Sequence, residues 1–299
     1  MKTLMAVLAS VVLAGAALAQ DTLASRIAHT DPSKYRAAPR VHGGAGELDF
    51  FGLFGANVFT TNVIFLHRGV LPPGGGIGHH FHHQCEEMFV IFDNAAQFTI
   101  DGRTSVLQGP AGAPCRMGHS HAIYNHTDKP TQWMNINVGS VHGRYDNEDL
   151  GDDRVGAPLD PKPVFSTMRL DPKLLRPVEA LHGGRGTARY RRALRSEMFH
   201  SNWEYVDHLI LPPDTSDGLH RHDYMEEFYY VNSGRGRVTV DKENAAIGPG
   251  DAVPIRLGEA HSFYNPNSQE LELMIVGVSL EKGKLDVTEL RGGAGQARR

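Results

Sequence analysis

The chain contains two histidine-rich blocks that match each other at a spacing of 140 residues. The first, residues 78–87, reads GHHFHHQCEE, and the second, residues 218–227, reads GLHRHDYMEE. Farther along, residues 116–125 (RMGHSHAIYN) match residues 256–265 (RLGEAHSFYN) at the same spacing. No insertion separates the matched pairs, which are His80/His220, His82/His222, Glu87/Glu227, Thr99/Thr239, Asp101/Asp241, Arg116/Arg256, Gly118/Gly258, His121/His261, Tyr124/Tyr264 and Asn125/Asn265. Such regularity indicates two copies of one structural unit.

Each block carries part of a metal site. Alternate side chains of a β-strand share a face, so His80 and His82 point the same way, and the second block repeats the pair. Imidazole nitrogen suits Zn, Cu, Fe and Ni, and a nearby carboxylate such as Glu87 extends the choice to Mn. A fourth ligand is expected beyond a further strand and turn, within residues 116–125 and 256–265.

These blocks resemble the two motifs of the cupin superfamily, a Gly-led HxHx4E followed by PxGxxHxxxN. The resemblance covers roughly residues 50–140 and 195–280, and it implies an all-β chain of two tandem cupin (jelly-roll) barrels. It also implies a divalent transition metal in each barrel, up to two per chain. The implied ligands are His80, His82, Glu87 and His121 in the first barrel, and His220, His222, Glu227 and His261 in the second.

The chain departs from the family pattern at two positions of the first unit and at one position of the second. After the ligand Glu and six intervening residues the family usually has Gly; the second unit has Gly234, but the first has Asn94, which tolerates the same left-handed turn. The first Pro of the second motif is Arg in both units, at Arg116 and Arg256. Neither change removes a metal ligand.

The expected organisation follows from the positions of these motifs. We expect the following segments: a signal peptide at 1–19, an N-terminal arm at 20–48, a first cupin domain at 49–141, a linker at 142–190, a second cupin domain at 191–282 and a tail at 283–299. The linker is acidic and rich in proline, and a short helix is expected within it near 172–181.

The N-terminus is typical of an exported protein. Lys2 precedes an apolar stretch that ends in small residues at Ala17-Leu18-Ala19, which predicts cleavage after Ala19 and export to a periplasm or the medium. The apolar stretch is shorter than a membrane span requires, so no membrane attachment is expected after cleavage. The formal charge of −4, from 30 basic and 34 acidic residues, gives no reason to expect nucleic acid as a partner.

The chain has two cysteines, Cys85 and Cys115. Their counterparts in the second unit, Met225 and Ile255, are apolar, which indicates that both positions face a packed interior. In an exported protein the pair invites a disulfide. Two buried thiols, or a redox-active pair, are the alternatives.

Strand periodicity also predicts what surrounds the metals. Phe89, Ile91 and Ile123 each lie an even number of positions from a ligand of the first set, so their side chains should point to the same face as the ligands. In the second unit the same holds for Tyr229, Val231 and Phe263. Mainly apolar walls favour small organic ligands over heavily charged ones. Glu86 and Glu226 have the opposite parity, and we expect cross-strand pairs with Arg116 and Arg256 rather than arginines that bind a carboxylate substrate.

Three residues are candidates for catalysis. His119 lies in the turn two residues before a ligand, and Glu259 is its counterpart. Both residue types transfer protons near neutral pH when their pKa values are tuned. Tyr229 gives the second site a hydroxyl that Phe89 does not offer the first.

Three classes of function fit these features. The first is an exported bicupin metalloenzyme, an oxidoreductase of the dioxygenase kind, acting on a small organic substrate; its three His and one Glu resemble the ligand set of cupin dioxygenases and of oxalate-degrading cupins. The second is a Mn-dependent decarboxylase or lyase of the oxalate-decarboxylase type, which would need a charged group to bind the substrate and a proton donor; the sequence indicates no arginine inside the barrel and no lid motif. The third is a non-catalytic protein that binds a metal or a small molecule.

The metal itself is left open by the ligand set, because Fe, Mn, Cu, Ni and Zn all accept mixed nitrogen and oxygen ligands. A metal that prefers five or six ligands would keep one or two places for water, oxygen or substrate, which favours a reactive site over a structural one. Association into a homo-oligomer through sheet edges is also open, since exposed edges favour such pairing.

Overall fold

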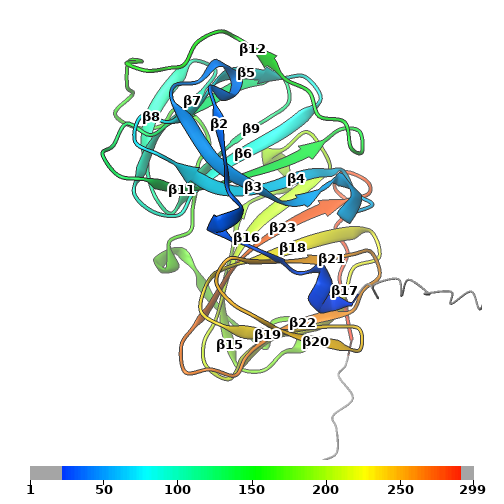
Figure 1. Ribbon diagram of the computed structural model, residues 1–299. Coiled ribbons are helices and arrows are strands. Elements are labelled where there is room, and N and C mark those ends of the chain that lie inside the picture. Colours follow the sequence, from blue (N-terminus) through cyan, green and yellow to red (C-terminus); the bar gives the residue numbers. More distant parts are fainter. Residues whose placement is uncertain (1–21, 291–299) are drawn as a thin grey trace, which may run out of the picture.

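The structure, a computed structural model, describes residues 22–290 as two antiparallel β-barrels in tandem (Figure 1). The first barrel, drawn in blue to green, lies above the second, drawn in yellow to orange. Each barrel is formed by one seven-stranded and one five-stranded sheet, which confirms the predicted all-β bicupin architecture. The predicted signal peptide and cleavage site lie outside the described residues.

In the first barrel the two sheets have the following strand orders. The seven-stranded sheet is β13 (Met168–Arg169), β9 (Ala111–Cys115), β6 (Cys85–Ile91), β11 (Thr131–Gly139), β4 (Val63–Leu71), β3 (Glu47–Gly55) and β2 (Arg36–Pro39). The five-stranded sheet is β12 (Glu148–Asp149), β5 (Gly76–His82), β10 (His119–Tyr124), β7 (Ala95–Ile100) and β8 (Arg103–Gln108).

The second barrel repeats this plan. Its seven-stranded sheet is β1 (Ala28–His29), β21 (Asp251–Ile255), β18 (Met225–Ser233), β23 (Leu271–Ser279), β16 (Trp203–Leu211), β15 (Thr187–Leu194) and β14 (Arg176–Glu179). Its five-stranded sheet is β20 (Glu243–Ile247), β19 (Gly236–Val240), β22 (His261–Asn265), β17 (Thr215–Arg221) and β24 (Thr288–Glu289). The described helices are short: α1 (Leu23–Arg26), η1 (Pro32–Lys34), η2 (Val41–Gly43), η3 (Ala56–Val58), η4 (Pro172–Leu174), η5 (Leu181–Gly183) and η6 (Ser196–Met198).

The segments expected to be an arm and a linker carry part of both barrels. The arm contains β2 and the linker contains β14, each an edge strand of a seven-stranded sheet. The two segments also cross over: β1, near the N-terminus, pairs with β21 of the second barrel, and β13, in the linker, pairs with β9 of the first. Instead of one helix near 172–181 there are two 3-10 turns, η4 and η5. Because these strands are short and largely exposed, their sequences resemble loops.

The two barrels meet through their seven-stranded sheets. All seven residues of β6 are buried, because Phe89 and Ile91 face the interior of the first barrel while Met88 and Val90 pack between the barrels. In β18, Tyr229 faces the interior of the second barrel and Phe228 packs between the barrels. Packing two sheet faces against each other buries both sides of these strands, which explains their continuous apolar runs.

Glu86 and Glu226 lie at this contact between the barrels. The Glu86 carboxylate accepts hydrogen bonds from the backbone N–H groups of His200 (2.7 Å) and Ser201 (2.8 Å), and from the Ser201 hydroxyl. The Glu226 carboxylate accepts from the N–H groups of Thr60 (2.8 Å) and Thr61 (2.6 Å). The predicted pairs with Arg116 and Arg256 are therefore wrong. Both glutamates point away from the metal ligands, as expected, but that face of the sheet packs against the other barrel.

Both cysteines are free thiols in the structure, so the disulfide is absent and the alternative of two buried thiols holds. In the strand register Cys115 lies opposite Glu87, whereas Cys85 lies opposite Gly139. Burial raises the pKa of the Cys85 thiol to about 12, and the pKa of Cys115 is also raised by burial. Neither thiol is therefore activated as a thiolate.

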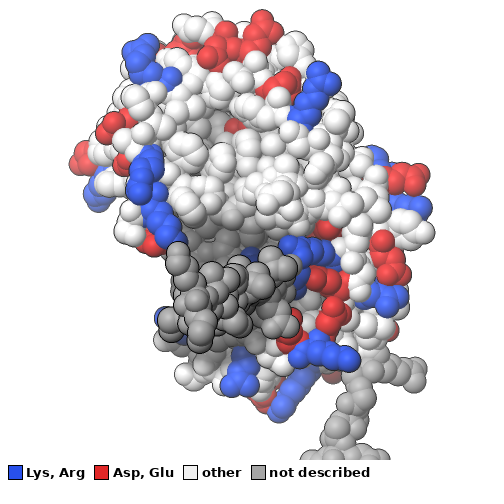
Figure 2. Space-filling view, turned by 45° about the vertical axis from the view of Figure 1, so that its right-hand side comes forward, with Lys and Arg blue, Asp and Glu red and all other residues white. Residues whose placement is uncertain are grey.

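On the face shown in Figure 2, acidic and basic residues are interspersed, mainly along the edges and over the lower half, and do not form one basic field. Within residues 22–290, no helix is long and apolar enough to cross a membrane.

Candidate metal centres

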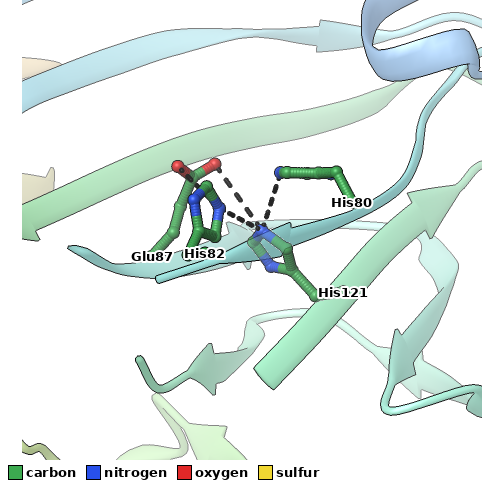
Figure 3. Close-up of side chains that lie close together, drawn as sticks. All are labelled: His80, His82, Glu87 and His121. Carbon is green, nitrogen blue, oxygen red and sulfur yellow. Dashed lines mark hydrogen bonds and ion pairs between the residues drawn. The ribbon is translucent and has the colours of Figure 1, made fainter. Parts of the chain in front are cut away.

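The first predicted ligand set comes together inside the first barrel (Figure 3). His80 and His82 lie on β5, Glu87 on β6 and His121 on β10, where His121 pairs directly with His80. Each of these side chains is almost fully buried, and their ligand atoms all lie within 4.8 Å of one another.

The second set comes together in the same way inside the second barrel. His220 lies on β17, Glu227 on β18 and His261 on β22, and His222 directly follows β17. His261 pairs with His220, as His121 does with His80. These four ligand atoms also lie within 4.8 Å of one another. Both sets thus confirm the grouping that the two sequence motifs predict.

The hydrogen bonds of the imidazoles prepare them for metal binding. Nδ1 of His80 lies 2.8 Å from the Gly78 carbonyl, and Nδ1 of His220 lies 2.8 Å from the Gly218 carbonyl. A carbonyl only accepts, so Nδ1 carries the proton and Nε2 presents its lone pair. Nδ1 of His82 faces the Asp146 carbonyl at 2.6 Å, with the same result.

The Nε2 atoms then converge on one point. Nε2 of His121 lies 3.0 Å from Nε2 of His80 and 3.1 Å from Nε2 of His82, as the dashed lines in Figure 3 show. In the second barrel the buried Nε2 of His220 has no hydrogen-bond partner among the described residues. Lone pairs crowded together away from water are unfavourable without a cation. The residues present therefore fit a divalent metal in both barrels.

Burial keeps the first set in the form that binds metal. It lowers the pKa of His80 to about 2, and it lowers the pKa of His121 well below its ordinary value. In the second set, burial alone would lower the pKa of His222, but the neighbouring Glu227 carboxylate outweighs it and the pKa rises to about 9. Burial of Glu227 is likewise outweighed by His222, which holds the pKa of this carboxyl well below its usual range.

Different groups hold the two ligand carboxylates. Glu87 accepts hydrogen bonds from the side-chain amides of Asn135 (2.6 Å) and Asn137 (2.7 Å) on β11. Glu227 accepts from two phenols, Tyr205 (2.6 Å) and Tyr229 (3.1 Å). The sequence comparison singled out Tyr229, and the structure places its hydroxyl at the second metal set, 3.3 Å from Nε2 of His261.

A single residue makes the second arrangement sterically possible. Gly277 stands on β23 where the first barrel has Asn137, and a Cβ at this glycine would lie 2.3 Å from the ring of Tyr205. The absence of a side chain at Gly277 therefore gives Tyr205 its access to Glu227.

A cavity of about 250 Å³ opens beside the second metal set. His222 and Glu227 are part of its lining. Apolar side chains cover much of the wall, namely Leu181, Leu209, Met225, Ile275, Leu285 and Val287. Two of the predicted wall residues contact metal ligands: Phe89 stacks on His121 with 4.3 Å between ring centres, and Phe263 lies edge-on to His261 at 6.5 Å. The other predicted wall residues are buried in the cores of their barrels and do not line the cavity, namely Ile91, Ile123 and Val231.

The cavity also contains an arginine, which the sequence analysis did not expect. Arg192 on β15 is held by Asp207 through two hydrogen bonds, from Nε to Oδ1 (3.0 Å) and from Nη2 to Oδ2 (3.1 Å). Its guanidinium lies 4.0 Å from the ring centre of Tyr205, and Tyr190 donates to Oδ2 of Asp207 at 2.7 Å. Burial raises the pKa of Asp207 to about 6, although Arg192 opposes the shift. The first barrel has Gly52 at the corresponding position.

Two histidines outside the predicted sites also contact the ligands. The ring of His42 stacks on His80 with 4.0 Å between ring centres, and His182 lies at the same distance from His220. Nδ1 of His182 is 2.8 Å from the Asp217 carboxylate. Both histidines obey the 140-residue spacing, so extending the repeat into the arm and the linker would have found them.

His119 and Glu259 do not join either metal set. Nδ1 of His119 lies 2.6 Å from the Asp101 carboxylate, and the residue lines a separate cavity. Glu259 forms an ion pair with Arg26 at 2.5 Å and lines the surface next to β20. Of the three residues considered for catalysis, Tyr229 alone lies at a metal set.

Known proteins similar to this chain point to one family. The model of the cupin domain family matches residues 207–277. The oxalate-binding protein of Thermotoga maritima is 30% identical over 103 residues, which span 34% of this chain and 85% of that protein. An uncharacterized protein of Methanocaldococcus jannaschii is 27% identical over 84 residues, 28% of this chain and 67% of that protein.

Among solved structures, oxalate decarboxylase from Bacillus subtilis has a similar fold. One of its structures matches with a TM-score of 0.59 and 17% identity, covering 88% of this chain and 79% of that one. A second, determined at pH 4.6, matches with a TM-score of 0.57 and 17% identity, covering 85% and 78%. With a complete set of three histidines and one glutamate inside each of its two barrels, this chain belongs to the cupin family.

Proposed function

We propose that the protein is a metal-dependent enzyme that removes a carboxyl group from a small organic acid in its second barrel. The observation that carries this proposal is the position of Arg192, which lines the same 250 Å³ cavity as the metal ligands His222 and Glu227. A guanidinium beside a metal centre can bind one carboxylate while the substrate reaches the metal. The sequence alone offered no such arginine.

The residues of the cavity have distinct roles in this proposal. Arg192 binds the substrate carboxylate, and Asp207 with Tyr190 holds the guanidinium in place. The apolar walls keep bulk water from the reacting group. Tyr229 orients Glu227 by hydrogen bonding; its pKa is raised well above the ordinary value by burial, so it stays protonated.

The reaction needs a proton, because loss of CO2 leaves an electron pair on the carbon that carried the carboxyl group. Asp207 is the group we assign to this transfer, since a pKa of about 6 suits proton exchange near neutral pH. The metal, when bound, would supply Lewis-acid stabilisation of negative charge on the substrate oxygens.

The relatives suggest where to begin with substrate and metal. One relative is an oxalate-binding protein, and the structurally similar oxalate decarboxylase is described with Mn(II) centres. Oxalate and Mn(II) are therefore the first substrate and metal to test, followed by malonate and other small acids that a cavity of about 250 Å³ can hold.

The test is CO2 release by the Mn(II)-loaded protein, with and without oxygen. We expect release from at least one small acid, with no stoichiometric consumption of oxygen. The Arg192→Gln variant should keep its metal. Its KM should be about tenfold higher or more, because it loses the charge-assisted hydrogen bonds to the substrate carboxylate. Arg191→Gln is the matched control, because Arg191 neighbours Arg192 on β15 but does not line the cavity. Unchanged kinetics in Arg192→Gln would contradict the proposal.

A second candidate function is an oxygen-dependent cleavage of a small phenol or enol, as in cupin dioxygenases. The apolar part of the cavity lining favours this candidate, because five aliphatic side chains and one methionine contribute to the wall. Oxygen uptake in proportion to substrate loss, without dependence on Arg192, would support it over decarboxylation.

We further propose that the protein acts outside the cytoplasm after cleavage behind Ala19. The support is the charged start, apolar stretch and small residues of 1–19. N-terminal sequencing of the protein from the medium or periplasm should begin at Gln20; a protein that retains Met1 in the cytoplasm would contradict this.

A further inference from the structure

A second cavity, of about 230 Å³, lies where the first barrel, the connector between the barrels and the second barrel meet. Arg116 and His119 contribute from the first barrel, Phe165 and Ser166 from the connector, and Met198 from η6 of the second barrel. Phe165 packs against the core of the first barrel, and Met198 against the core between the barrels. Sites where domains meet are frequent positions of small-molecule binding.

Of the two charged side chains in this cavity, that of Asp101 has hydrogen-bond partners and that of Arg116 has none among the described residues. The Asp101 carboxylate is engaged by Nδ1 of His119 (2.6 Å) and by the backbone N–H of Ser120 (3.0 Å). Among residues 22–290, the guanidinium of Arg116 has no hydrogen-bond or ion-pair partner, although the residue is half-buried. A partly buried cation without a partner is unfavourable, and an anion would relieve it.

The corresponding place in the second barrel shows how such a space is filled within the chain. In the 140-residue repeat, Glu259 occupies the position equivalent to His119, and Arg26 of the N-terminal segment occupies the position equivalent to Ser166. Arg26 pairs with Glu259 at 2.5 Å, and Glu259 also accepts a hydrogen bond from the backbone N–H of Arg256 (2.8 Å). The first barrel lacks both the filling side chain and its carboxylate partner.

We propose that the cavity at Arg116 binds a small organic acid that has one carboxylate and an apolar body. The guanidinium of Arg116 and the hydroxyl of Ser166 supply donors for the carboxylate, and Phe165 with Met198 supplies the apolar contact. This site is distinct from the metal centres and does not depend on the proposed reaction.

The test uses benzoate as the probe, measured by isothermal titration calorimetry on metal-loaded protein. The parent protein carries Arg192→Gln, so that the carboxylate site proposed in the second barrel does not contribute. We expect benzoate to bind this parent and the neutral isostere benzamide not to bind. Adding Arg116→Gln should weaken benzoate binding about tenfold or more, and Arg116→Lys should retain part of it.

A double variant that fills the cavity with an ion pair tests the proposal independently of Arg116. Ser166→Arg with His119→Glu builds into the first barrel the ion pair that the second barrel has, and it should abolish benzoate binding. Metal content and thermal unfolding report whether each variant is intact, and Arg116→Gln decides the outcome if the double variant does not fold. Equal binding of benzoate and benzamide, no benzoate binding to the parent, or unchanged affinity in Arg116→Gln would overturn the proposal.

Discussion

At the scale of single residues, the two barrels differ most in what surrounds the ligand glutamate. Two amides hold Glu87, whereas two phenols hold Glu227. The sequence comparison found Tyr229 because it lies two residues beyond a motif glutamate. It did not find Tyr205 or Arg192, because each reaches the site from another strand and neither belongs to a motif. Arg192 also lies at the start of the predicted second domain, next to the presumed linker.

Asp207 leads to a prediction about pH. A substrate carboxylate at Arg192 adds negative charge beside Asp207, so it should raise the Asp207 pKa above its value of about 6 in the free protein. Binding then takes up a proton, and KM should fall as the pH decreases toward about 6 and level off below it. Initial rates between pH 5 and 8 would measure this. Because Asp207→Asn removes the proposed proton donor, its substrate affinity is measured by calorimetry, and this affinity should not depend on pH over the same range. A wild-type KM that rises as the pH falls from 8 to 6 would contradict the assignment.

At the scale of elements, the seven-stranded sheets join the barrels as well as building them. The sequence predicts the strand parity correctly at β6 and β18, since alternation is a local property of the backbone. It cannot identify the partner of Glu86, because the N–H groups of His200 and Ser201 are more than a hundred residues away and belong to the other barrel. Apolar residues on both faces of β6 were the signal that a second packed surface exists.

The interface glutamates give a prediction about stability. Glu86→Gln replaces a buried carboxylate that accepts two backbone hydrogen bonds with an amide that presents an NH2 group to one of the same donors. We expect the free energy of unfolding, from urea denaturation at pH 7, to fall by about 1–3 kcal/mol. Glu226→Gln should have a similar effect.

An exposed residue provides the control for this measurement. Glu148 has a side chain that is 63% exposed, so Glu148→Gln should leave the free energy of unfolding nearly unchanged. If Glu86→Gln were as stable as Glu148→Gln, the carboxylates would not contribute to holding the barrels together.

At the scale of the whole molecule, the 140-residue repeat extends farther than the motifs that reveal it. Matching strands run from β1 and β13 at one end to β12 and β24 at the other. The fold and both ligand sets could be predicted because the motifs are contiguous and occur twice. The exchange of β1 and β13 between barrels could not be predicted, because strands of two residues leave no periodic pattern to detect.

The two centres should also differ in how metal binding depends on pH. His222 has a pKa of about 9 without metal, so it is protonated at pH 7 and must lose a proton to bind. His80, with a pKa of about 2, is already neutral. Metal titrations in buffers of different ionisation enthalpy should therefore show about one more proton released by His80→Ala protein, which keeps the second centre, than by His220→Ala protein. Equal proton release by the two variants would contradict this difference.

We infer that each barrel holds its own metal ion through three histidines and one glutamate. Elemental analysis of the protein, purified without chelator, tests this directly in wild type, His80→Ala and His220→Ala. We predict two transition-metal ions per chain in the wild type, one for each ligand group, and the loss of one ion in each variant. A wild type without transition metal, or variants with the same metal content as the wild type, would contradict the account.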